Sequence, residues 1–199
     1  MKNFVLGISG ASGGPYGLRV ARALLEAGHR VQLVASAEGE RVLRYETGLD
    51  PAAFAASLPE EARSLLRIHR SADLFAPIAS GSFATDGMAI VPCSMAAVAA
   101  IANGTGGDLL RRAADVHLKE GRPLVVVFRE APLSRIHLRN LLVLAEAGAT
   151  VLPAAPAFYG RPRTMEDLID FVAGRALAAL GVESSLAPVW SPPEDSVNR

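Results

Sequence analysis

A glycine-rich segment near the N-terminus contains residue types that can hold an anion. It reads GISGASGGPYG from Gly7 to Gly17, and Ser12 adds a hydroxyl donor. Glycines let the backbone turn tightly and approach a ligand, and the N–H groups at the start of a helix attract negative charge. The spacing is neither the GxGxxG of dinucleotide folds nor a P-loop, because no Lys-Ser or Lys-Thr pair follows. The segment predicts a phosphate-binding turn, with a plain tight turn as the alternative.

Two later segments also place a hydroxyl where an apolar run gives way to a helical pattern. Ser36 stands where dinucleotide folds usually have an acidic residue for the ribose. A mononucleotide is therefore favoured over NAD, although Glu38 keeps NAD open. Ser94, in the sequence PCSMA, is expected to cap a helix and to meet a ligand. Cys93 has no histidine near it in sequence, so we interpret it as a small buried side chain rather than a nucleophile.

Charged and aromatic candidates occur further along the chain. Arg129 and Glu130 follow an apolar run, where they must either pair with each other or face a polar ligand. Lys119 and Lys2 are the only lysines among 20 Lys and Arg residues, and arginine does not reproduce a compact three-donor ammonium. Tyr159 stands in a Pro- and Gly-rich loop, and the small-residue loop 79–83 could lie against a flat ring.

The elements that must position these residues alternate along the chain. Strands are expected at 3–8, 31–36, 88–92, 123–128 and 150–153, and helices at 15–27, 38–47, from 94, at 108–120, 134–147 and 164–180; residues 50–70 are also expected to be helical. Apolar strands alternating with helices predict a Rossmann-like, doubly wound α/β fold, a parallel sheet with helices on both faces. Ligands bind beyond the carboxyl ends of such strands, so the loops described above should form one site.

Length and composition exclude several classes of protein. The 199 residues are 50% hydrophobic and 20% charged, which suits a single domain over residues 1–190 with a flexible tail at 191–199. A formal net charge of zero argues against a nucleic-acid binder. One cysteine excludes a disulfide within the chain and a CxxC zinc site. No signal-peptide core or membrane-spanning run is present, so a soluble cytoplasmic protein is expected.

Taken together, several segments resemble the UbiX family of flavin prenyltransferases. They are GISGASGGPYG, PIASGSF, AIVPCSMAAVAAIANG, RAADVHLKEGRPLVVVFREAPLS, HLRNLLVLAEAGATVLPAAPAFY and EDLIDFVAGRAL, and they cover nearly the whole chain. Members of this family join a dimethylallyl group from dimethylallyl phosphate to N5 and C6 of reduced FMN. The product, prenylated FMN, is the cofactor of UbiD-type decarboxylases. The resemblance implies a Rossmann-like fold, no metal, and a homododecamer with sites between subunits.

The resemblance also assigns residues by position. FMN binding falls to Gly10, Ala11, Ser12, Ser36, Cys93, Ser94, Met95, Ala96 and Arg129. The prenyl phosphate falls to Tyr159, Arg175, Lys119 and Arg129, and the catalytic set is Glu130, Lys119, Glu46 and Tyr159. Fixed cations and a phenol hydroxyl suit a departing phosphate. Glu130 would protonate that phosphate and later take the C6 proton, with the phosphate as a competing base. A monophosphate donor needs no magnesium clamp, and the chain has no DDxxD motif.

Some positions depart from the family pattern, and two alternatives stay open. Leu74 stands where an aromatic residue, commonly Trp, is usual, Phe128 replaces a proline, and the stretch 106–108 lacks an asparagine. One alternative is an FMN-dependent decarboxylase of the cysteine type, which uses a catalytic histidine and a PASANT-like loop. Here the loop reads PIASGSF, and His69, His117 and His137 fall in helix-like segments. The other alternative is a flavin-binding protein without turnover.

Overall fold

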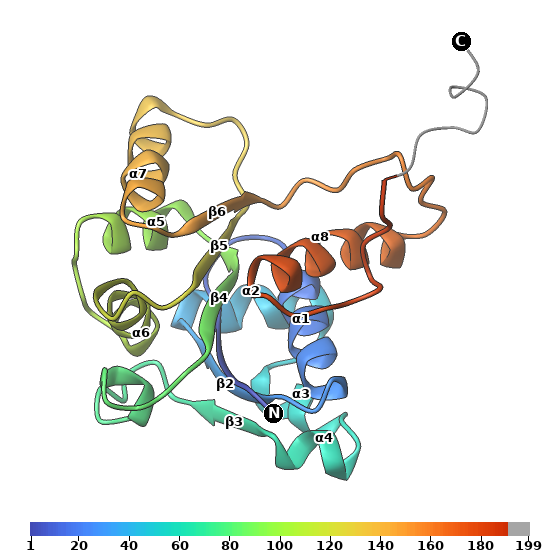
Figure 1. The fold of residues 1–199 in the computed structure, drawn as a ribbon, viewed down its shortest axis with the longest axis horizontal. Coiled ribbons are helices and arrows are strands. Elements are labelled where there is room, and N and C mark those ends of the chain that lie inside the picture. Colours follow the sequence, from blue (N-terminus) through green and yellow to red (C-terminus); the bar gives the residue numbers. More distant parts are fainter. Residues whose placement is uncertain (191–199) are drawn as a thin grey trace.

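A parallel sheet forms the centre of the molecule (Figure 1). The computed structural model describes residues 1–190. The strands are β1 (Asn3–Ile8), β2 (Arg30–Ala35), β3 (Leu66–His69), β4 (Gly87–Cys93), β5 (Leu124–Phe128) and β6 (Thr150–Pro153). They form one six-stranded sheet in the order β3-β2-β1-β4-β5-β6, and each neighbouring pair is parallel. The predicted doubly wound α/β fold is confirmed.

Helices cover both faces of this sheet. They are α1 (Gly14–Glu26), α2 (Ala37–Thr47), α3 (Pro51–Ala56), α4 (Glu60–Ser64), α5 (Met95–Ala102), α6 (Leu109–Lys119), α7 (Arg135–Glu146) and α8 (Met165–Ala179), with a 3₁₀ turn at Pro77–Ala79. Side chains of α1 and α8 pack in one apolar core, and those of α5, α6 and α7 pack in the other. Figure 1 shows these two groups on opposite sides of the strands.

Buried side chains alternate between the two cores along the central strands. In β1, Phe4, Leu6 and Ile8 contribute to the α1–α8 side, whereas Val5 contributes to the other. This is the period of two that a strand imposes, and both faces are apolar because both are covered. Each such side chain contributes about 1.5–3 kcal/mol by leaving water.

Residues 50–70 are not one helical stretch, so that expectation is wrong. Two short helices, α3 and α4, are followed by the edge strand β3, whose Leu66 pairs with Val31 of β2. The four-residue strand has little pattern of its own, and pairing with β2 makes it extended. His69 therefore belongs to a strand rather than a helix, and its Nε2 lies 2.8 Å from the Gln32 side-chain oxygen.

Local signals place most helix starts correctly. Ser36, Ser94 and Ser134 cap α2, α5 and α7, and Thr164 forms a capping box with Asp167 at the start of α8. The expected tail at 191–199 lies outside the described residues. No helix in the described part is long and apolar enough to cross a membrane.

Candidate functional site

The crevice between β1 and β4 lies where the winding of the sheet reverses. β1 leads into α1 on one face, and its neighbour β4 leads into α5 on the other. The two loops diverge and leave a crevice at the carboxyl edge, the usual ligand position in such sheets. The buried Ser9 hydroxyl joins them, because its Oγ accepts the Ser94 N–H at 2.7 Å and donates to the Pro92 carbonyl at 3.2 Å.

Backbone donors gather in this crevice. Within residues 1–190, the N–H groups of Gly10 and Ser12 in the first loop, and of Met95 and Ala96 at the start of α5, have no hydrogen-bond acceptor. Such groups favour an anion. A Cβ at Gly10 would lie 2.7 Å from the Glu38 Cβ, so this turn requires glycine. The loops therefore fit a phosphate group.

Both predicted hydroxyls of this region cap helices. Ser36 Oγ accepts the Gly39 N–H at 3.1 Å, and Ser94 Oγ accepts the Ala97 N–H at 3.2 Å. A capping hydroxyl keeps its own hydrogen available to donate. Each can therefore hold its helix and donate to a ligand at the same time.

An apolar cleft adjoins the first loop. Its volume is about 440 Å³, and it is lined by Ser12, Gly13, Pro15, Tyr16, Glu46, Arg129, Ala154, Met165 and Ile169. One guanidinium, one carboxylate and two hydroxyls thus lie in a wall that is otherwise largely hydrocarbon. This composition suits a ligand with a small apolar group attached to an anion.

Three of the predicted residues meet at this cleft. The half-buried Glu46 carboxylate, from α2, accepts the N–H groups of Gly13 at 3.0 Å and Gly14 at 2.8 Å, where the positive end of the α1 dipole lies. Arg129, after β5, donates from Nε to the Ser12 carbonyl at 3.3 Å. Burial raises the pKa of the neighbouring Tyr16 phenol, Arg129 opposes that shift and Glu46 adds to it.

Cys93 is fully buried at the end of β4, as we interpreted it from the sequence. Burial raises the pKa of its thiol to about 12, although a hydrogen bond with Ser9 lowers it in part. The thiol is therefore protonated at neutral pH and cannot act as a nucleophile.

Glu130 is exposed beside Arg129 at the carboxyl end of β5. Its carboxylate accepts the N–H of Ala131 at 3.1 Å. No ion pair joins Arg129 to Glu130 among the ion pairs of residues 1–190. Both side chains are therefore available to a ligand.

Lys119 is not brought to this cleft within one chain. It ends α6, which runs back to the amino edge of the sheet before β5 begins, and its ammonium pairs with Glu120. The loop 79–83, expected to lie against a flat ring, is on the same edge, where Arg122 donates to the Gly81 carbonyl at 2.5 Å and the Phe83 carbonyl at 2.9 Å. The chain direction of α6 separates Lys119 from Arg129, which follows β5.

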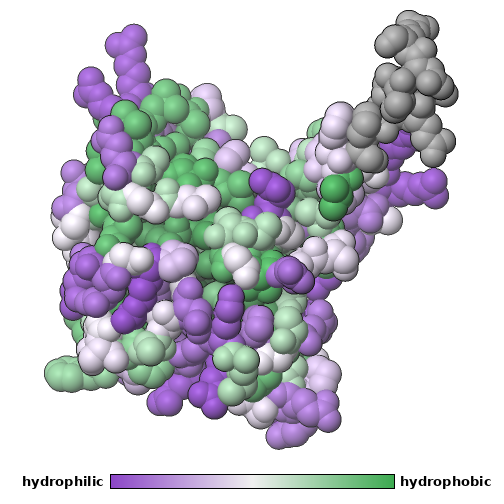
Figure 2. Space-filling model, viewed as in Figure 1, coloured by the Kyte–Doolittle hydropathy of each residue, from purple (hydrophilic) through white to green (hydrophobic). Residues whose placement is uncertain are grey.

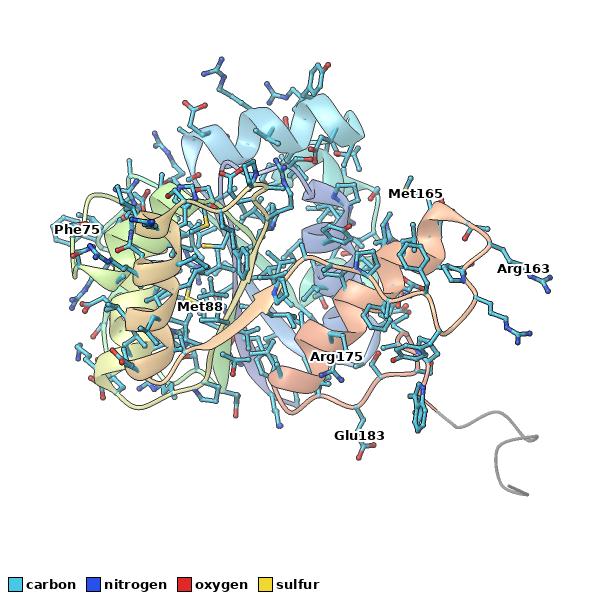
Figure 3. The ribbon with its side chains drawn as sticks, turned by 90° about the horizontal axis from the view of Figure 1, so that it is seen from above. Phe75, Met88, Arg163, Met165, Arg175 and Glu183 are labelled. Atoms are coloured by element: carbon cyan, nitrogen blue, oxygen red, sulfur yellow. The ribbon has the colours of Figure 1, made fainter. Side chains whose placement is uncertain are left out.

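Tyr159 and Arg175 also lie away from the cleft. The Tyr159 hydroxyl donates to the Pro188 carbonyl at 3.1 Å, and its ring packs edge-on against Phe171. Arg175 is exposed one turn beyond Phe171 on α8. Figure 3 shows Arg175 well along α8 from Met165, which lines the cleft.

Sequence reasoning missed several residues of this site. Ser9 and Tyr16 were within the quoted glycine-rich motif but received no role. Met165 and Ile169 line the cleft from the first turns of α8, and only their i, i+4 spacing marked a common face.

The departures from the family pattern lie outside the cleft. Leu74 is half-exposed in the segment after β3, and Phe128 packs in the core on the α5–α7 side. No group of three or more His, Cys, Asp or Glu side chains that could hold a metal is found in residues 1–190.

Comparisons of this sequence with a family model and with known proteins agree on its family. The sequence model of the Flavoprotein family matches residues 1–177. The protein named flavin prenyltransferase UbiX from Halalkalibacterium halodurans is 45% identical over 199 residues, covering 98% of this chain and 97% of that protein. The protein of the same name from Synechocystis sp. is 48% identical over 194 residues, covering 94% of this chain and 94% of that protein.

Solved structures agree with these relatives. AnUbiX (PadA1) in complex with FMN and dimethylallyl pyrophosphate superposes with a TM-score of 0.88 at 41% identity, covering 97% of this chain and 99% of that one. A dodecameric FMN-dependent Ubix-like decarboxylase from Escherichia coli O157:H7 superposes with a TM-score of 0.87 at 40% identity, covering 96% of this chain and 100% of that one. The structure of a PPC decarboxylase mutant complexed with pantothenoylaminoethenethiol superposes with a TM-score of 0.61 at 21% identity, covering 78% of this chain and 84% of that one, which is a likeness of fold alone.

Proposed function

Because this chain belongs to the Flavoprotein family and is a flavin prenyltransferase of the UbiX type, we propose that its crevice and cleft together form the active site. In this site a dimethylallyl group is joined to N5 and C6 of reduced FMN. The donor is dimethylallyl phosphate or the corresponding pyrophosphate. The observation that carries this proposal is the adjacency of a backbone anion site to an apolar cleft containing Arg129, Glu46 and Ser12.

The first loop and α5 hold the flavin nucleotide. The free N–H groups of Gly10, Ser12, Met95 and Ala96 bind the phosphate, and the Ser36 and Ser94 hydroxyls donate to the phosphate or the ribityl chain. This use of fixed backbone dipoles needs no rearrangement when FMN binds. Reduced FMN supplies the nucleophilic atoms of the reaction.

The cleft holds the prenyl donor. Arg129 binds its phosphate, and the apolar wall excludes water that would capture an allylic cation. Glu130 protonates the departing phosphate and then takes the C6 proton, with the phosphate as the competing base. The Glu46 carboxyl group, held by the N–H groups of Gly13 and Gly14, lines the cleft in which the cation develops.

Residues from other copies of the chain complete the site. Lys119, Tyr159 and Arg175 bind the prenyl phosphate across subunit interfaces, in a homododecamer like the one named for the Escherichia coli relative. Separation of Lys119 from Arg129 within one chain supports this arrangement. We place the enzyme in the cytoplasm, where it passes prenylated FMN to a UbiD-type decarboxylase.

A direct assay tests the proposal. The protein is mixed anaerobically with reduced FMN and either dimethylallyl phosphate or dimethylallyl pyrophosphate, and the flavin is analysed by mass spectrometry. We expect a flavin that carries one additional C5H8 unit. Bound FMN without this adduct from either donor would leave a flavin-binding protein without turnover. Release of CO₂ from a peptide with a C-terminal cysteine would instead support the decarboxylase alternative.

A further inference from the structure

An aromatic ring lines the cleft beside its charged residues. Tyr16, in the first turn of α1, shares the lining with Glu46 and Arg129, and it is the only aromatic side chain among the lining residues, all of which are described. The ring packs against the apolar core on the α1–α8 side, and one edge lies so close to Gly13 that a Cβ there would come within 2.8 Å of the Tyr16 Cδ2. This packing holds the ring in the wall of the cleft.

Apolar packing, and not a hydrogen bond, orients the Tyr16 side chain. Its ring packs against the core on the α1–α8 side, and its hydroxyl has no hydrogen bond to any of residues 1–190. The other wall residues, such as Met165 and Ile169, are aliphatic and carry no aromatic face. Tyr16 therefore supplies the one aromatic ring of the lining that a cation formed in this cleft can contact.

We propose that Tyr16 contacts the dimethylallyl group and stabilises its positive charge through the face of the ring. This inference rests on the proposed function. When the C1–O bond of the donor breaks, phosphate leaves with the electron pair and the allyl group becomes positive. N5 of reduced FMN then forms the new C–N bond, and its proton passes to the released phosphate. A ring face attracts such a cation electrostatically, and the interaction strengthens when water is excluded. Because the charge exists only near the transition state, Tyr16 accelerates the reaction more than it tightens donor binding.

Substitutions at Tyr16 distinguish a role of the ring from a role of the hydroxyl. Single-turnover adduct formation is measured with enzyme in excess over reduced FMN at saturating dimethylallyl phosphate. We expect Tyr16→Phe to keep the wild-type rate within about twofold, and Tyr16→Leu to lose about tenfold, with the donor concentration at half-maximal rate unchanged. Tyr45→Leu, on the 93% exposed Tyr45 of α2, is the matched control. A Phe variant as slow as the Leu variant would assign the role to the hydroxyl and overturn the proposal.

A second series of variants keeps the shape of the side chain, so that the fold is preserved. Phenylalanine with one, two or three ring fluorines is placed at position 16, which withdraws charge from the ring face with little change in shape. We expect the rate to fall stepwise with each fluorine while FMN affinity stays constant. Equal rates across the series would overturn the role of Tyr16, although the wild-type enzyme still makes prenylated FMN. Absence of the adduct from the wild-type enzyme would instead overturn the proposed function.

Discussion

The Ser9 hydroxyl accepts the backbone N–H of Ser94 at 2.7 Å, across the point where the sheet reverses its winding. The same hydroxyl donates to the Pro92 carbonyl, so one buried side chain joins the loops after β1 and β4. These loops carry most of the predicted FMN-binding residues. Their spacing therefore depends on a serine far from Ser94 in the sequence.

Replacing Ser9 tests this connection. Ser9→Ala leaves the Ser94 N–H without its acceptor, whereas the Pro92 carbonyl still accepts the backbone N–H of residue 9 at 3.0 Å. Because one donor loses its partner, we expect the free energy of unfolding to fall by about 1–3 kcal/mol. FMN affinity should also fall. Urea unfolding and FMN titration measure the two effects. Ser64→Ala, on the exposed helix α4, is the control, and an equally small loss in both variants would contradict the prediction.

The Ser12 hydroxyl is predicted to bind the FMN phosphate region. Ser12→Ala keeps the backbone carbonyl that Arg129 contacts but removes the hydroxyl donor. We expect the FMN dissociation constant to rise about tenfold, the usual effect of one hydrogen bond to a charged group. Fluorescence titration of FMN measures this against the Ser64→Ala control. Unchanged affinity would argue against the first loop as the phosphate site.

Glu130 is predicted to transfer protons. Glu130→Gln keeps the size of the side chain but cannot exchange a proton, so we expect FMN to stay bound and adduct formation to slow about a hundredfold. Rapid-quench measurement of prenylated FMN provides the rate. Glu183→Gln, on the exposed residue labelled beyond α8 in Figure 3, is the matched control. A wild-type rate in Glu130→Gln would remove this role.

Sites shared between subunits predict complementation. Lys119→Ala and Glu46→Gln should each lower the rate at least about tenfold, because each removes a charge from every site. When the two variants are co-expressed with different tags, some sites of a mixed oligomer take intact Lys119 and Glu46 from different copies. We expect purified mixed oligomers to regain part of the activity. If Lys119 served the site of its own chain, no activity would return.

The apolar surface of α7 fits such an assembly. Ile136, Leu138, Leu142 and Val143 are exposed on this helix. Figure 2 shows an extended hydrophobic area over the same side of the molecule. A soluble monomer rarely leaves a helix face this apolar.

The Cys93 thiol predicts a dependence of stability on alkaline pH. Its pKa is raised from 9.0 to about 12, so the folded chain retains a proton that the unfolded chain releases above pH 9. Its contribution to stability is therefore complete below pH 9 and is lost as the pH rises towards 12, by up to about 1.4 kcal/mol per pH unit. Urea unfolding near pH 8 and near pH 10.5 should show a steeper decline for the wild-type chain than for Cys93→Ala. Parallel declines would contradict the assignment.

Much of the fold follows from the sequence because its signals act over a few residues. The runs at 3–8 and 150–153 form β1 and β6 with those bounds, and Ser94 and Thr164 start their helices by bonding N–H groups in the next turn. The glycine-rich segment is likewise recognisable, since the tight turn and its donors are local.

Only the tertiary structure decided which distant residues meet. Residues 66–69 form a strand through pairing with β2, and Glu46 reaches the N-terminus of α1 because α2 packs beside it. Lys119 and Arg129 are ten positions apart, yet the helix and the strand that carry them run in opposite directions and leave them on opposite edges of the sheet. A sequence pattern specifies each element, but the edge at which two residues meet depends on strand order and chain direction, which are properties of the folded chain as a whole.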